Sequence, residues 1–118
     1  MSQDESRAYQ RVGVRTSVTI VTRLPLIRTY RGWTDDLSPG GARILCEEDI
    51  REEELFLQVM LPGLKEHFFR GKVVRCDLSV VPAIRGGDRT LHAYGVQFIG
   101  ICAPGEVEAW ARPALCNA

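Results

Sequence analysis

The chain has 118 residues, with 15 basic and 15 acidic side chains, 45% hydrophobic residues, 11 glycines and 6 prolines. A chain of this length buries one hydrophobic core and not two, so it predicts a single small domain. Its net charge of zero excludes a broad electrostatic binder of nucleic acid or anionic membranes, because that affinity comes from a summed positive field. The 13 arginines against 2 lysines fit either a planar or phosphate-bearing partner or a GC-rich genome.

The N-terminus opens with polar and acidic residues and lacks the apolar core of a signal peptide. No apolar run approaches the ~18 residues that cross a bilayer. We therefore expect a cytoplasmic protein without membrane insertion. The cysteines are expected to be reduced thiols, and their spacing contains no C-x-x-C pair, so no metal site is predicted. They are Cys46, Cys76, Cys102 and Cys116.

The predicted elements begin with a basic segment, residues 1–15, ahead of the first strand. Residues 1–31 carry six arginines against two acids, whereas residues 35–54 carry eight acids against two arginines. Neighbouring segments of opposite charge usually mean solvated loops that attract each other. The spacing of two of the arginines favours a binding role instead.

Short runs of alternating apolar and polar residues, separated by glycine and proline, predict six β-strands. The alternation is clear in the fourth run, where Leu55, Leu57 and Val59 share one face. The strands are expected at 16–23, 27–34, 42–46, 55–61, 67–76 and 91–99.

The connections between these strands differ in character. Residues 36–41 have turn chemistry, because aspartate and serine bond nearby backbone amides and glycine tolerates positive φ. Residues 46–54 read as an acidic loop, and residues 77–90 read as a long mobile loop because they contain proline and a glycine pair. After the last strand, residues 105–111 predict a short helix that ends before Pro113.

Six strands without recurring helices favour a small closed barrel, because closure removes exposed strand edges. The helix is expected to cap the barrel with Val107 and Trp110, which lie three residues apart on one face. The chain then divides into a basic segment (1–15), a barrel (16–103) and a C-terminal helix and tail (104–118).

Two motifs carry the functional argument. Arg7 and Arg11 stand four residues apart around an aromatic residue, and after 24 further residues Asp36 begins a D-x-S-x-x-G motif. Neither motif is specific alone, since the chain has three such arginine pairs and repeats D-x-S at 77–79 without the glycine. The combination, placed before and after the first two strands, is specific.

This combination resembles the PilZ family of bacterial receptors for cyclic di-GMP, whose pattern is R-x-x-x-R followed by D/N-x-S-x-x-G. The chain reads R-A-Y-Q-R at 7–11 and D-L-S-P-G-G at 36–41. Similarity extends to G-K-V-V-R at 71–75 and Y-G-V-Q-F-I-G at 94–100, which resemble the last two strands of that barrel.

The resemblance implies a six-stranded antiparallel PilZ-like barrel with a short C-terminal helix. It also implies cyclic di-GMP as the ligand, no other cofactor, and a downstream protein partner in motility, polysaccharide or virulence control. The residues that the resemblance assigns to ligand binding are Arg7, Arg11, Asp36, Ser38, Gly40 and Gly41.

Chemistry supports these roles. A guanidinium can bond O6 and N7 of guanine with both arms and can also stack on the base, which suits Arg7 and Arg11. The carboxylate of Asp36 accepts the N1–H and N2–H₂ donors that arginine cannot bond. Ser38 adds a hydroxyl, and Gly41 lets the backbone approach the ligand closely. We expect residues 1–11 to be mobile without ligand and to fold onto the barrel when it binds, which changes the surface that a partner meets.

Three other functions stay open. A PilZ-like adaptor would not bind nucleotide. A barrel that binds single-stranded nucleic acid would use Trp33, Tyr30, Arg28 and Arg31 as a stacking surface, although ordinary strand packing explains these residues more simply. An enzyme is disfavoured because the chain has no catalytic motif, and binding of DNA is not expected.

Overall fold

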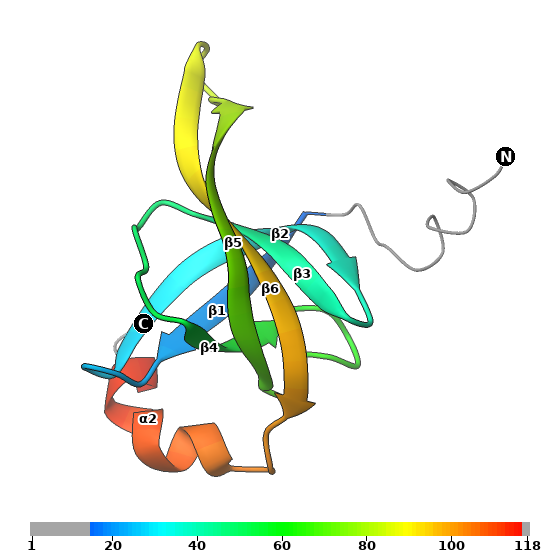
Figure 1. Cartoon of the computed structure of the whole chain (residues 1–118), viewed down its shortest axis with the longest axis vertical. Helices are drawn as coiled ribbons and strands as arrows, with labels where there is room; N and C mark the ends of the chain where they lie inside the picture. The colour runs from blue at the N-terminus through cyan, green and yellow to red at the C-terminus, as the bar shows by residue number, and fades with distance from the viewer. Residues whose placement is uncertain (1–14, 117–118) are drawn as a thin grey trace, which may run out of the picture.

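The computed structural model describes residues 15–116, which form a closed six-stranded antiparallel β-barrel with one C-terminal helix (Figure 1). The strands follow one another around the barrel in the order β1-β2-β3-β6-β5-β4. This architecture confirms the predicted fold class. The elements are β1 (Thr16–Thr22), β2 (Arg28–Ser38), β3 (Gly41–Cys46), β4 (Glu54–Val59), β5 (Phe69–Pro82), β6 (Asp88–Ile101) and α2 (Glu106–Cys116).

The barrel interior is filled by every second side chain of each strand, the ones that point inward. Val18, Ile20, Leu55 and Leu57 are buried almost completely, as the period-two pattern predicts. Tyr94 reaches the same core from β6 and is 1% exposed. Its hydroxyl accepts a hydrogen bond from the Ile50 amide (2.6 Å) and donates one to the Glu48 carbonyl (3.0 Å). The acidic connection between β3 and β4 is thereby fixed to the core.

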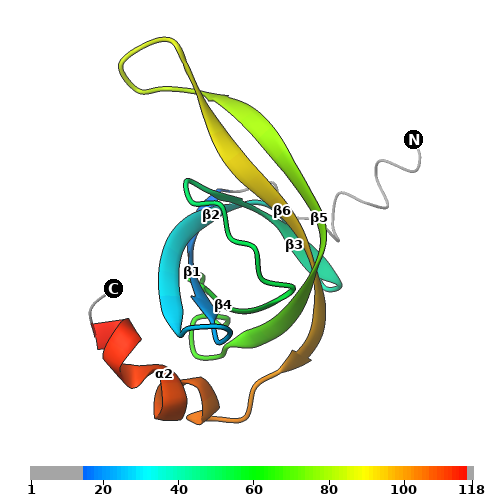
Figure 2. The same cartoon turned by 60° about the vertical axis from the view of Figure 1, so that its left-hand side comes forward.

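Helix α2 covers one end of the barrel, as Figure 2 shows. Val107 and Ala111 are buried in a second cluster with Phe56, and the Trp110 ring meets the Phe56 ring edge-on with centroids 5.1 Å apart. The prediction of a capping helix with Val107 and Trp110 on its packed face is confirmed. No helix within residues 15–116 has the length and apolar character needed to cross a membrane.

The predicted end of the helix was wrong. The helix continues to Cys116 with Pro113 inside it. A proline there removes one backbone hydrogen bond and crowds the preceding turn. Leu115 packs against the cluster of Val107 and Ala111, and this tertiary contact offsets the local cost of the proline.

The prediction of a mobile loop at 77–90 was also wrong. Strands β5 and β6 pair from Phe69 opposite Ile101 to Pro82 opposite Asp88, and beyond the bulge at 73–75 the register is unbroken to Pro82. The two strands project as a ribbon in both views (Figures 1 and 2). The turn is confined to 83–87, where Gly86 and Gly87 adopt positive φ.

An apolar cluster on the outer face of the barrel explains why the ribbon is ordered. Val81 and Leu91 from the ribbon pack with Leu45, Ala93 and the half-buried Trp33. Trp33 therefore takes part in strand packing, and Tyr30 packs against the barrel core. These contacts agree with the simpler of the two interpretations of the aromatic residues on β2.

Candidate functional site

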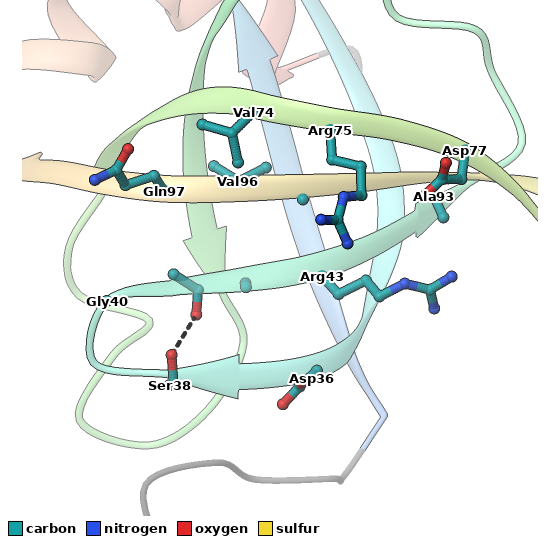
Figure 3. A pocket seen from close by; sticks show the side chains of 13 residues that line it. Asp36, Ser38, Gly40, Arg43, Val74, Arg75, Asp77, Ala93, Val96 and Gln97 are labelled. Atoms are coloured by element: carbon teal, nitrogen blue, oxygen red, sulfur yellow. Dashed lines mark hydrogen bonds between the residues drawn. The ribbon is translucent and has the colours of Figure 1, made fainter. Parts of the chain in front are cut away.

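The D-L-S-P-G-G motif builds the β2–β3 hairpin. The predicted turn at 36–41 was too long, because β2 continues to Ser38 and β3 begins at Gly41. Ser38 pairs with Gly41 and its hydroxyl donates to the Gly41 carbonyl at 3.3 Å, which the dashed line in Figure 3 marks. The hydroxyl thus closes the turn, while its oxygen keeps lone pairs that can accept a further hydrogen bond.

An open cleft of about 690 Å³ lies between this hairpin and strands β5 and β6. Its volume falls within the range typical of small-molecule sites. All four predicted site residues that the structure describes line it, namely Asp36, Ser38, Gly40 and Gly41. The other two predicted residues, Arg7 and Arg11, lie outside the described residues.

Two arginines in the cleft were missed by the sequence analysis. In the pairing register, Arg43 on β3 and Arg75 on β5 both lie opposite Gly95 of β6. Gly95 has no side chain, so the two arginines flank a bare stretch of backbone, as Figure 3 shows from close by. The sequence shows Gly95 between the buried residues Tyr94 and Val96, but only the register of three strands places the two arginines beside it.

The motif's last glycine is required by strand packing. A Cβ atom at Gly41 would lie only 2.2 Å from the carbonyl oxygen of Val96 on β6, whereas a Cβ at Gly40 would meet nothing within 4 Å. Gly41 therefore lets β3 and β6 approach each other, which is a reason for glycine independent of any ligand. Gly40 contributes its carbonyl, which accepts a hydrogen bond from the Phe98 amide at 2.9 Å.

Charges in and beside the cleft are arranged around Asp35. The β2–β3 register shifts between Thr34 and Asp36, so Asp35 is the extra residue of a β-bulge. Its carboxylate pairs with the Arg43 guanidinium, and the Arg15 guanidinium lies 3.4 Å from its other oxygen. Among residues 15–116, Arg75 has no ion-pair partner, so it is the cation of the cleft that is available to an anionic ligand.

The cleft also contains Asp77 and Gln97, which add a carboxylate and an amide to the polar lining. In the described part of the chain, no group of three or more histidine, cysteine, aspartate or glutamate side chains could hold a metal ion. The carboxylate acceptors and guanidinium donors of the lining suit an organic ligand that has both hydrogen-bond donors and negative charge.

A family model for the PilZ domain matches residues 5–106. The chain belongs to the PilZ domain family. The match runs from just before the R-A-Y-Q-R motif to the first residue of α2, so it includes the whole barrel. Within this PilZ domain, the D-L-S-P-G-G motif occupies the β2–β3 hairpin at the edge of the cleft.

A solved structure agrees with the family at the level of the fold. The PilZ domain with c-di-GMP of YcgR from Escherichia coli has a TM-score of 0.56 and 16% identity, over 91% of this chain and 86% of that one. The Bacillus subtilis inhibitor of motility (MotI/DgrA) has a TM-score of 0.46 and 16% identity, over 91% of this chain and 48% of that one. A comparison with curated protein sequences finds no match.

Proposed function

We propose that this PilZ domain is a receptor that binds cyclic di-GMP (c-di-GMP) in the cleft beside the β2–β3 hairpin. One observation carries the proposal: the four described residues of the predicted site line a single open cleft together with Arg43 and Arg75. The similarity in fold to the E. coli YcgR PilZ domain, whose structure is described with c-di-GMP, supports the choice of ligand.

Each part of the ligand finds matching chemistry. The Asp36 carboxylate accepts the N1–H and N2–H₂ donors of a guanine. Arg75 supplies a cation for a phosphodiester, and Arg43 supplies a second one if the ligand displaces Asp35 from it. The cleft is therefore suited to a dianion with guanine edges, and less suited to a neutral apolar molecule.

The proposed site is completed by Arg7 and Arg11. In this proposal, segment 1–15 is a basic switch that closes over the bound ligand, residues 16–103 form the receptor barrel, and residues 104–118 form its helix and tail. One arginine bonds O6 and N7 of guanine while the other stacks on a base. Closure alters the surface beside the cleft, and a protein partner in motility, polysaccharide or virulence control responds to it. The activity is binding and signalling and not catalysis.

Calorimetric titration of the full chain with c-di-GMP tests the proposal, with GTP and a single-stranded oligonucleotide as controls. We expect micromolar affinity for c-di-GMP and none of comparable strength for either control, because ordering the basic segment offsets much of the contact energy. Absence of binding would leave a PilZ-like adaptor, and preference for the oligonucleotide would indicate a nucleic-acid module.

Matched variants locate the site. Arg43→Ala should weaken c-di-GMP binding at least about tenfold, equal to about 1.4 kcal/mol, whereas Arg51→Ala should not. Both arginines pair with an aspartate, but only Arg43 lines the cleft. Binding that survives the double change Arg7→Ala and Arg11→Ala would refute the site assignment. Hydrogen exchange of segment 1–15 that is equal with and without saturating c-di-GMP would refute the switch.

A further inference from the structure

Strand β5 has a free edge along the ribbon. Strand β4 pairs with it only from Phe69 to Lys72, and the Val73 amide donates one more hydrogen bond to the Glu53 carbonyl at 2.8 Å. Beyond that point, within the part of the chain that the structure describes, the backbone of β5 pairs only with β6. Figure 2 shows this part of β5 extending past the barrel. An unpaired strand edge is a template for another strand.

The regular part of this edge is bounded on both sides. A register shift between Val73 and Arg75 marks a β-bulge at one end, and Pro82, which lacks an amide hydrogen, closes the other. The free regular edge is therefore residues 75–81, with Leu78 at its centre.

The bulge and Pro82 protect the two ends of this edge, but its middle carries an exposed apolar face. Every second residue, Cys76, Leu78 and Val80, lies on one face of the ribbon. All three are exposed, Leu78 by 65% and Val80 by 64%. Charged side chains commonly guard such edges, and the two in this segment, Arg75 and Asp77, alternate with the apolar residues and so lie on the other face of the ribbon. An exposed apolar face beside unpaired strand backbone indicates an interface.

We propose that a second copy of this chain covers the edge, through antiparallel β5–β5 pairing about a two-fold axis at Leu78. In this register Cys76 lies opposite Val80 of the partner subunit, and Asp77 lies opposite Ser79 of the partner subunit. Directly opposed residues of an antiparallel pair share a face, so the apolar side chains of the two copies meet on one side.

The length and charge of the segment favour an axis at Leu78 over its neighbours. With Leu78 on the axis, all seven residues from 75 to 81 pair. An axis at Asp77 would oppose two carboxylates, which destabilises a pair of strands. An axis at Cys76 would pair only three residues of the segment before reaching the bulge. An axis at Ser79 would pair five before reaching Pro82. The edge is thus complementary to a second copy of itself about a two-fold axis, which is the requirement for an isologous dimer.

Cross-linking of the ligand-free full chain tests both the dimer and its register, and it is independent of c-di-GMP binding. In a Cys76→Ser background, Leu78→Cys places one thiol from each copy at the axis, so mild oxidation should give a disulfide-linked dimer whose mapped bond joins the two introduced cysteines. In the natural sequence the two Cys76 thiols are offset by four residues, about 13 Å along the strands, and should not join. A mapped Cys76–Cys76 bond would refute the register.

Sedimentation of lysine variants tests the interface. Leu78→Lys and Val80→Lys should each raise the dimer dissociation constant at least tenfold, with unchanged circular dichroism. Ile84→Lys is the matched control, because Ile84 is fully exposed at the turn, outside the paired segment. The proposal fails if the natural chain stays monomeric at every soluble concentration, if another segment or protein pairs with this edge instead, or if Ile84→Lys dissociates the dimer equally.

Discussion

Replacing Gly41 by alanine separates two roles that the D-L-S-P-G-G motif combines. The new Cβ would lie 2.2 Å from the Val96 carbonyl oxygen and 3.4 Å from the Gln97 Cα, both backbone atoms of β6. Because backbone cannot rotate away as a flexible side chain can, β3 and β6 must separate locally. Gly40→Ala makes the same chemical change one residue earlier and meets nothing within 4 Å.

The expected cost follows from this geometry. Overpacking a well-packed region costs about 1–3 kcal/mol. For a chain of this size, a loss near 2 kcal/mol lowers the melting temperature by roughly 8–10 °C. Gly40→Ala should be neutral or stabilising by up to about 1 kcal/mol, because it restricts the unfolded chain and its φ is not in the left-handed region.

Urea unfolding of both variants without ligand, followed by tryptophan fluorescence, measures the difference directly. A lower midpoint with an unchanged slope is the expected result for Gly41→Ala. If Gly41→Ala unfolds at the natural midpoint and loses only c-di-GMP binding, the glycine serves the ligand and the packing argument is wrong. The argument also fails if Gly40→Ala costs as much.

Further predictions concern buried groups away from the cleft. Tyr94→Phe leaves the Ile50 amide without its acceptor and should cost about 1–3 kcal/mol in urea unfolding at pH 7. Burial raises the pKa of Tyr94 to about 12, so the protonated hydroxyl stabilises the fold fully below pH 10, and this stabilisation is lost as pH rises towards 12. The free energy of unfolding of Tyr94→Phe should therefore fall less between pH 10 and 12 than that of the natural chain. Burial likewise raises the pKa of the Cys46 thiol to about 12, so alkylation at pH 8 followed by mass spectrometry should modify the exposed Cys76 long before Cys46. Trp110→Ala removes a half-buried ring and should destabilise the domain by about 2–3 kcal/mol, with faster hydrogen exchange throughout α2.

The sequence was informative wherever the pattern is local. Alternation in residues such as Leu55 and Leu57 predicted the barrel, because a half-buried strand needs that period. The ribbon was missed because Pro82 and a glycine pair are typical of a loop, whereas the ribbon is stabilised by the contact of Val81 and Leu91 with the cluster that includes Leu45 and Trp33. That contact joins residues far apart in the chain and leaves no local signal.

The same distinction applies to the candidate site. Asp36 and Ser38 were found because their spacing belongs to one short motif. Arg43 and Arg75 meet only across Gly95, through the register of three strands, which no short window of sequence encodes. Helix α2 was predicted correctly at its start and too short at its end, since the packing that stabilises its last turn is also tertiary.

The ribbon's continuity has a mechanical consequence. The same β6 that carries Gly95 at the floor of the cleft runs on, without a break in pairing to β5, to the turn at 83–87. From Gly95 to Asp88 the strand spans roughly 23 Å at about 3.3 Å per residue. A rotation of about 5° at the cleft would therefore displace the far end by about 2 Å. If the ribbon turns as one rigid body about the cleft, a small rotation there becomes a larger displacement at the turn, and it must also shift the contacts of Val81 and Leu91 with the barrel.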